Sequence, residues 1–225
     1  MRTLLIPVAR WERWVHNFVA RHGETSFAVV DSAWRGVGAD DATFVARLPF
    51  DRSYATSPAV LARAPSEGEV GAEPELADLD PGLGEHFIAA AAPPPDWGVL
   101  LVRKGGFAVA RLSGSQMSAS KTGQRHVQGR TKAGGQSQQR FARRRDNQAR
   151  VAYEAAAEHA ARLLVGAALP VVCGGDRAAV TAVLADARLA HLTPLARWLP
   201  VPDPRRQVLE QAVADALALE VSITP

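Results

Sequence analysis

The stretch from Ser137 to Val165 contains no proline and consists largely of alanine, arginine and other strong helix formers. It predicts a single long helix that ends near Gly166. At ~1.5 Å per residue this helix would run for roughly 40 Å. The second half of the chain must therefore be built around one element that is longer than most helices of globular proteins.

Short apolar segments on either side of this helix predict strands. Trp97–Val102 and Phe107–Leu112 flank the turn Lys104-Gly105-Gly106 and predict a hairpin. After the helix, the pattern predicts a buried strand at Pro170–Cys173, a helix at Arg177–Ala187, a strand at Trp198–Val201 and an amphipathic helix at Arg205–Leu217. Strands that alternate with helices indicate an α/β fold with a mixed or parallel sheet covered by helices.

The first half of the chain predicts a smaller α/β unit. Val8–Arg21 has the apolar spacing of an amphipathic helix, and strands are expected at Phe27–Val30 and Thr43–Leu48. From Arg63 to about Gly84 the sequence is acidic and rich in Pro and Gly, which is typical of a flexible connection that ends at the stiff Pro93-Pro94-Pro95. We therefore expect an N-terminal unit at residues 1–62, a connection at 63–95 and a second domain at 96–225.

Positive charge is concentrated in one segment of the chain. Nine bases and one acid, Asp146, lie between Lys121 and Arg150, and nine minus one gives a charge of +8. The remaining seventeen bases and twenty-two acids sum to −5. Such a segment on an acidic body indicates a polyanionic partner. The alternative is a solvated helix face.

The segment that precedes the long helix is polar. Ser113–Gly135 contains almost no apolar residue and predicts a loop of ~20 residues, a length that is often functional. The loop leads into the tripeptide Gly134-Gly135-Gln136. On composition alone this triplet would be an ordinary glycine-rich loop, with Ser137 as the N-cap of the helix.

The residues that follow the Gly-Gly-Gln triplet form a recognisable pattern with it. The sequence continues Ser137-Gln138-Gln139-Arg140-Phe141-Ala142-Arg143-Arg144-Arg145, with Tyr153 and Glu158 further along. It resembles the catalytic domain of eukaryotic and archaeal class I peptide chain release factors, in which Gly-Gly-Gln is followed by serine, two variable residues, Arg-Phe and a basic helix. The resemblance covers about Asp96 to Pro225. It implies the mixed, ribonuclease H-like sheet of that middle domain.

Two differences from the class I release factors show which of their relatives the chain resembles most. The chain has no Asn-Ile-Lys-Ser signature for reading stop codons, and it ends too soon for a domain that binds a GTPase partner. It is most similar to the Vms-type release-factor-like hydrolases, in particular their actinobacterial branch. This implies a cytoplasmic, codon-independent peptidyl-tRNA hydrolase that frees nascent chains from stalled ribosomes or large subunits. Its partners would be peptidyl-tRNA and the rRNA of the peptidyl-transferase centre. No membrane, DNA, metal or cofactor is expected.

The chemistry of the triplet agrees with this role. Gly134 and Gly135 give a tip without side chains that can adopt positive φ and enter a narrow RNA-walled site. Gln136 carries a neutral amide that can both donate and accept hydrogen bonds. We expect this amide to place water against the ester carbonyl, and the Gln136 backbone N–H to stabilise the developing oxyanion.

A basic helix face would hold the RNA. Arg140, Arg144 and Asn147 share one face at i, i+4 and i+7, and Arg143 lies beside them. Guanidinium groups bind phosphates well because their fork of N–H donors matches phosphate oxygens. The sequence therefore predicts an RNA-binding set made of the helix residues and two bases of the preceding loop: Arg130, Lys132, Arg140, Arg143, Arg144 and Asn147.

Two other functions remain open from the sequence. One is a ribosome-binding rescue or quality-control module that does not hydrolyse the ester, and the other is a nuclease that acts near the tRNA 3′ end. The predicted hairpin strands carry no acid, so a two-metal nuclease would lack its usual carboxylates. The six histidines show no ligand spacing with cysteine or acids, which makes a zinc site unexpected.

Several further motifs have simpler interpretations. Gly114-Ser115-Gln116 and Thr122-Gly123-Gln124 are not followed by Ser-x-x-Arg-Phe, so neither is expected to be catalytic. Gly174-Gly175 could hold a phosphate at a helix start, although an ordinary strand-to-helix turn is the expected reading. Cys173, the only cysteine, is expected to be a small buried residue.

Overall fold

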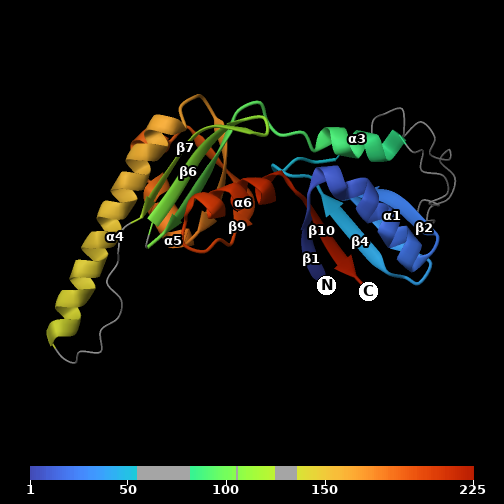
Figure 1. Cartoon of the computed structure of the whole chain (residues 1–225), viewed down its shortest axis with the longest axis horizontal. Helices are drawn as coiled ribbons and strands as arrows, with labels where there is room; N and C mark the ends of the chain where they lie inside the picture. The colour runs from blue at the N-terminus through green and yellow to red at the C-terminus, as the bar shows by residue number, and fades with distance from the viewer. Residues whose placement is uncertain (55–81, 105, 125–135) are drawn as a thin grey trace. The chain divides into compact units, whose positions relative to one another are not determined.

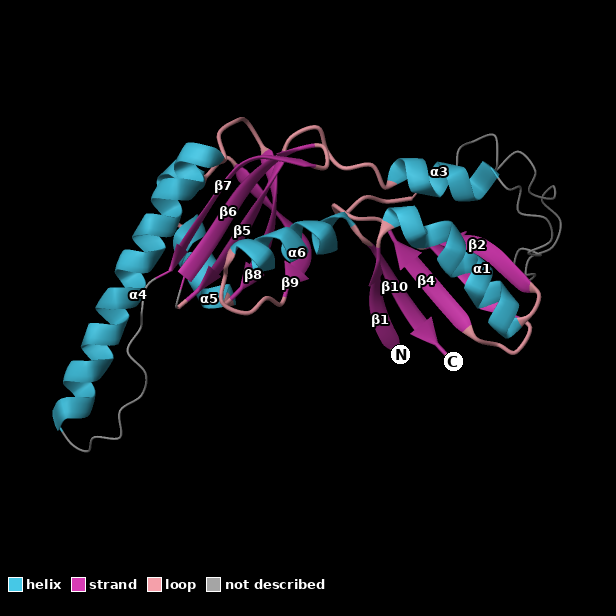
Figure 2. Ribbon diagram, viewed as in Figure 1, coloured by secondary structure: helices cyan, strands magenta, loops and turns pink. Residues whose placement is uncertain are grey.

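The computed structural model describes residues 1–54, 82–104, 106–124 and 136–225, and of residues 82, 83, 85 and 136–149 it describes the backbone alone. The chain forms two compact units, each with its own five-stranded sheet (Figures 1 and 2). Unit 1 comprises Met1–Ala92 together with Leu217–Pro225, and unit 2 comprises Pro93–Ala216. The predicted α/β class, with a mixed sheet and flanking helices, is confirmed.

Unit 1 is built on an antiparallel sheet. Its strands are β1 (Arg2–Ile6), β2 (Thr25–Val30), β3 (Ala33–Gly38), β4 (Thr43–Arg47) and β10 (Leu219–Thr224). They lie in the order β1-β10-β4-β3-β2, and every neighbouring pair is antiparallel. The helices of this unit are the 3-10 turn η1 (Val8–Arg10), α1 (Trp11–His22) and α3 (Gly82–Ala90).

The core of unit 1 is aromatic. Trp11 is buried, stacks on Trp14 at 5.3 Å between ring centroids and meets Trp34 and Phe44 edge-on. Gly36 on β3 lies under the Phe44 ring, where an added Cβ would come within 2.2 Å of a ring carbon. Glycine is therefore required at this position by close packing.

The two compact units divide the chain at other places than the boundaries expected from the sequence. Residues 63–95 were expected to connect two domains, but α3 belongs to unit 1, and its Phe87 is completely buried against Trp11, Trp34 and Tyr54. The second domain was expected to reach residue 225, but β10 pairs with β1 and β4 of unit 1. The physical reason is the alternation of Leu219 and Val221, both fully buried, with outward-facing polar residues.

Unit 2 contains a mixed sheet. Its strands are β5 (Trp97–Arg103), β6 (Gly106–Ser113), β7 (Gln116–Gln124), β8 (Leu169–Gly175) and β9 (Leu192–Leu199), in the order β7-β6-β5-β8-β9. The first three strands form an antiparallel meander, and β5, β8 and β9 run parallel. The predicted hairpin is β5–β6. Of the strand predicted at Trp198–Val201, the first two residues form the end of the longer β9, and the other two lie beyond it.

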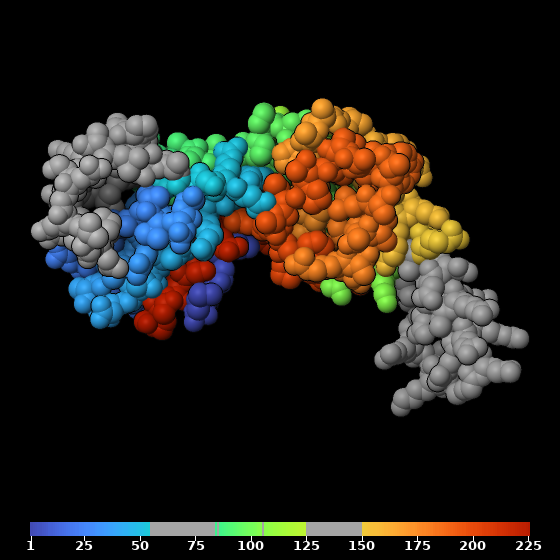
Figure 3. All heavy atoms as spheres, turned by 180° about the vertical axis from the view of Figure 1, so that it is seen from behind, coloured from blue at the N-terminus to red at the C-terminus, as the bar shows by residue number. Residues whose placement is uncertain are grey.

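Helices cover both faces of this sheet. The long helix α4 (Gln136–Leu163) and α5 (Arg177–Leu184) pack on the face that carries Leu100, Val102 and Val109. On the other face, Arg206 of α6 (Arg206–Leu217) donates a 3.0 Å hydrogen bond to Ser120 of β7. Atoms of the residues after α4 dominate the surface of unit 2 seen from behind (Figure 3).

The polar loop expected at Ser113–Gly135 is only partly a loop. Residues 116–124 form β7, which pairs with β6 along its whole length, and residues 125–135 lie outside the described residues. The strand was missed because it is an edge strand of Ser, Thr, Lys and Gln, with little apolar alternation to reveal it. A polar sequence can still form a strand when a neighbouring strand provides partners for its backbone hydrogen bonds.

Gly123 of β7 gives a test of this pairing. An added Cβ would lie 2.3 Å from the Phe107 ring, so we expect Gly123→Ala to destabilise unit 2 by about 1–3 kcal/mol in thermal or urea unfolding. The cost should shrink in a Phe107→Leu background, because the smaller side chain leaves room for the methyl group. An equal cost in both backgrounds would show that the Phe107 ring does not occupy this space.

Candidate functional site

Helix α4 spans 28 residues and begins at Gln136, directly after the Gly134-Gly135 pair. The sequence predicted a helix from Ser137 to Val165, so its existence and length are confirmed to within two residues at each end. Gly134, Gly135, Arg130 and Lys132 lie outside the described residues. Of the proposed catalytic tip, the structure thus places the backbone of Gln136, in the first turn of the helix.

The C-terminal half of α4 is fixed to the sheet. Ala152, Ala156, Ala157, Ala160 and the following Leu164 are buried there. Alanine has the smallest methyl-bearing side chain, so the helix axis can approach the strands closely. The N-terminal turns of α4 extend past the end of the sheet (Figure 1).

Two side chains bind the carbonyl groups at the C-terminal end of α4. Arg111 of β6 donates to the carbonyl oxygens of Leu163, at 3.3 Å, and Val165, and it also pairs with the carboxylate of Asp96. The Nε2 atom of His191 lies at hydrogen-bond distance from the Leu164 carbonyl. These contacts satisfy carbonyls that a helix end leaves without a partner, and a cation there also suits the helix dipole.

This anchor was not predicted from the sequence. A signal was present, because Arg111 is the one charged residue within the otherwise apolar return strand Phe107–Leu112. A charged residue that interrupts an apolar strand needs a partner when it is half-buried. What it would contact could not be read from the sequence, since Asp96 and Leu163 lie 15 and 52 residues away.

Helical spacing connects the proposed RNA-binding positions to the described half of α4. Gln136, Arg140, Arg143 and Asn147 follow one another at intervals of four, three and four, and the same series continues with Arg150, Glu154 and Glu158. The last three are exposed. The buried positions Ala152, Ala156 and Ala160 lie well around the helix, at about 100° per residue. Within the described half of α4, the solvent-facing side is therefore the one that carries Arg150, Glu154 and Glu158.

The two halves of α4 differ in charge. Arg150 pairs with Glu154 at 2.9 Å, and Arg162 with Glu158 at 3.6 Å, so the exposed charge of the C-terminal half is largely neutralised. Residues 136–149 contain four arginines and one acid, Asp146. The excess positive charge predicted from the sequence is thus confined to the N-terminal half of the helix and the segment before it.

A small basic cluster lies where α4 passes β7. The imidazole of His159 stacks on Phe107 at 5.4 Å, and its Nδ1 atom is 2.6 Å from Arg162. Burial lowers the pKa of His159, and the positive charges of Arg162 and Lys121 lower it further. The imidazole therefore stays neutral at pH values where an isolated histidine would begin to take a proton.

The other sequence motifs have structural roles. Gly114 adopts φ +56° in the turn between β6 and β7, and Gln116 is the first, exposed residue of β7. Gly175 adopts φ +98°, and an added Cβ would lie 2.3 Å from the Val102 carbonyl oxygen. The carboxylate of Asp176 accepts a 3.0 Å hydrogen bond from the Ala178 N–H and caps α5. An acid already occupies that helix start, so Gly174-Gly175 is an ordinary strand-to-helix turn.

Cys173 is buried in β8, as expected, and burial raises the pKa of its thiol to about 12. Among the residues that the structure describes, no group of three or more His, Cys, Asp or Glu side chains is arranged to hold a metal ion. No helix within that part of the chain is long and apolar enough to span a membrane.

Comparisons with known proteins bear on unit 2. A comparison with the curated proteins gave no match. Among solved structures, the chain is similar to Archaeoglobus fulgidus Pelota with 12% identity and a TM-score of 0.23, over 95% of this chain and 62% of that one, so it spans less than two thirds of that protein. The model of the Actinobacteria/chloroflexi VLRF1 release factor family matches residues 95–222, which include β5 to α6 and the Gly134-Gly135-Gln136 tripeptide. Since the match spans more than half of the sequence, the chain belongs to the Actinobacteria/chloroflexi VLRF1 release factor family.

Proposed function

We propose that this protein is a codon-independent peptidyl-tRNA hydrolase that releases nascent chains from stalled ribosomes or large subunits in the cytoplasm. The observation that carries the proposal is the position of Gln136, which begins a long helix directly after two glycines, in a member of a release factor family. Peptidyl-tRNA and the rRNA around the peptidyl-transferase centre would be its partners.

In this proposal the chemistry is one of orientation. The Gln136 amide holds a water molecule against the ester carbonyl. A nucleophile that is held in position reacts much faster than free water does. The backbone N–H of Gln136 has no partner further back in the helix, because the first four N–H groups of a helix are free of intrahelical bonds. It can therefore donate to the oxyanion that forms when water attacks. No protein nucleophile takes part.

The geometry of α4 suits delivery of this tip to a deep site. The anchored half holds the helix on unit 2, while the N-terminal half extends past the sheet with Gln136 at its end (Figure 1). Arg140, Arg143, Arg144 and Asn147, with Arg130 and Lys132, would bind rRNA or acceptor-stem phosphates along the way. The C-terminal half of α4, whose arginines pair with Glu154 and Glu158, would remain outside the RNA-walled site, where this pairing serves solubility.

Incubation with ribosome-bound peptidyl-tRNA, followed by sizing of both products, tests the proposal. Ester hydrolysis frees the peptide and leaves the tRNA at full length. A shortened tRNA would instead indicate a nuclease acting near the 3′ end. Binding without any product would indicate a rescue module that does not hydrolyse the ester.

The helix arginines give a separate prediction about binding. Arg143→Gln combined with Arg144→Gln should weaken binding to large subunits and lower the slope of log affinity against log salt by about two, one for each lost phosphate contact. Release from complexes that are already bound should change much less. Affinity measured over a salt series checks both expectations.

The same helix offers a matched control. Arg150→Gln with Arg162→Gln removes the same charge, but these guanidinium groups already pair with Glu154 and Glu158, so binding should change little. If the two double variants lose the same affinity and slope, the effect comes from net charge alone. The assignment of an RNA-binding role to Arg143 and Arg144 would then be wrong.

A further inference from the structure

Unit 1 lies almost entirely outside the residues that the family model matches, and its helix α1 carries an exposed basic face. Arg13, Asn17 and Arg21 follow one another at i, i+4 and i+8, so they form one line along the helix. Arg10 occupies the N-cap position, at the start of the same face. All four side chains are exposed.

The α1 arginines differ from several other exposed arginines in having no acidic partner among the described residues. Arg150, Arg162, Arg188 and Arg206 each lie within 4 Å of a carboxylate. Among the described residues, no such pair involves the arginines of α1: Arg10, Arg13 and Arg21. An unneutralised line of guanidinium groups is available for a polyanion.

The nearby acids do not cancel this charge. Glu12 is the only acid of α1 and lies about 100° around the helix from Arg13. At the other end of the helix, the Asp40 carboxylate is 2.9 Å from His22, and this hydrogen bond lowers the pKa of Asp40. That carboxylate is directed to His22 and does not reach the arginines.

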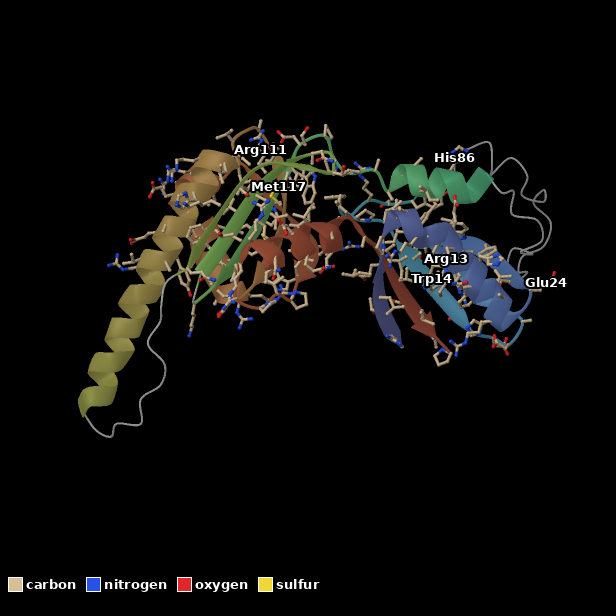
Figure 4. All side chains as sticks on the ribbon, viewed as in Figure 1. Arg13, Trp14, Glu24, His86, Arg111 and Met117 are labelled. Carbon is tan, nitrogen blue, oxygen red and sulfur yellow. The ribbon has the colours of Figure 1, made fainter. Side chains whose placement is uncertain are left out.

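A partly exposed tryptophan borders the basic face. Trp14 is next to Arg13 on α1 (Figure 4) and is held in place from beneath. It stacks on Trp11 at 5.3 Å with an interplanar angle of 9°, and it meets the Phe44 ring edge-on. Trp14 also stacks on Phe18 at 5.8 Å, so its packing holds α1 on the core of unit 1 and fixes the position of the neighbouring Arg13.

We propose that this face of α1 is an RNA-binding surface, with Arg10, Arg13 and Arg21 on phosphates. The identity of the RNA rests on the proposed function, which makes it the RNA of the large ribosomal subunit. Unit 1 would then supply a second contact with the ribosome, separate from the arginines of α4. Two contacts on one chain raise the apparent affinity because the second binding event becomes intramolecular.

The test compares two double variants of the full chain in binding to purified large subunits over a salt series. Arg13→Gln with Arg21→Gln should lower the affinity by at least about tenfold near 0.1 M salt and flatten the salt slope by about two. The control is Arg35→Gln with Arg47→Gln. These two arginines are exposed on the same unit and lie on the sheet face away from Trp34, Phe44 and Ala46, so the control should bind like the unchanged protein. Thermal unfolding verifies that both variants remain folded.

The outcomes separate this inference from the proposed function. Equal losses in the two double variants, or no loss with Arg13 and Arg21 replaced, would overturn the RNA-binding surface on α1. Peptide release that depends on Gln136 would leave the hydrolase proposal intact in either case. Conversely, weaker binding on loss of Arg13 and Arg21 would support the surface even if no ester hydrolysis is found. A chain that does not bind large subunits at all would contradict both.

Discussion

Replacing Gln136 by alanine is expected to reduce peptide release by on the order of a hundredfold or more, the scale seen when a group that orients or stabilises the reacting atoms is removed. The fold should survive, because Gln136 begins α4, whose N-terminal turns extend past the end of the sheet (Figure 1). Binding to large subunits should also persist, since the phosphate contacts are assigned to other residues. Single-turnover release from ribosome-bound peptidyl-tRNA measures the effect.

Gln116 provides the matched control for this experiment. It follows Gly114-Ser115, it is exposed, and it lies at the start of β7. Gln116→Ala should therefore leave the release rate nearly unchanged. A release rate that falls for Gln116→Ala and holds for Gln136→Ala would mean that the wrong loop had been assigned to catalysis.

Removing residues 219–225 should unfold unit 1 and leave unit 2 folded. The deletion takes away β10, which lies between β1 and β4 in the sheet. It removes two fully buried side chains, Leu219 and Val221, worth about 1.5–3 kcal/mol each, together with backbone pairing on both edges. The loss approaches the ~5–15 kcal/mol that typically stabilises a whole domain.

Tryptophan fluorescence can follow the two units separately in this experiment. Trp11, Trp14 and Trp34 belong to unit 1, while Trp97 and Trp198 belong to unit 2. We expect a partial red shift of the emission and rapid proteolysis within residues 1–92, with a resistant fragment near Pro93–Ala216. Removal of Pro225 alone should change neither, because it follows the last strand residue and is exposed. If the truncated chain keeps a protected unit 1, β10 is not required for that sheet.

The elements that the sequence predicted well are those whose pattern is local. The long helix was found almost to the residue, because helix propensity and the absence of proline act within a few turns. The β5–β6 hairpin was found for the same reason, since its turn and both strands are adjacent. The long-range pairing of β10 with β1 joins residues more than 200 positions apart, and no local signal encodes it.

In the candidate site, too, local patterns were predicted from the sequence and long-range contacts were not. The choice of Gln136 and the shared helix face of Arg140, Arg144 and Asn147 come from a tripeptide and from helical spacing, both of which are local. The anchor that joins Arg111 to Asp96 and Leu163 is a tertiary contact and was missed. The polar strand β7 was missed as well, because a polar edge strand is specified by its neighbour β6 more than by its own residues.

The described contacts between α4 and the sheet lie in the C-terminal half of the helix, so a small tilt of that half moves the N-terminal end by a larger distance. From Gln136 to Ala152 the helix covers sixteen residues at ~1.5 Å each, so the first residue lies roughly 24 Å beyond the beginning of the buried stretch. Simple trigonometry then turns a tilt of about 5° at the support into a shift of about 2 Å at Gln136, and misplacements of ~1 Å can cost a hundredfold in rate. Residues that never approach the substrate, such as Arg111 and Ala156, would therefore control the position of the glutamine that we propose to be catalytic.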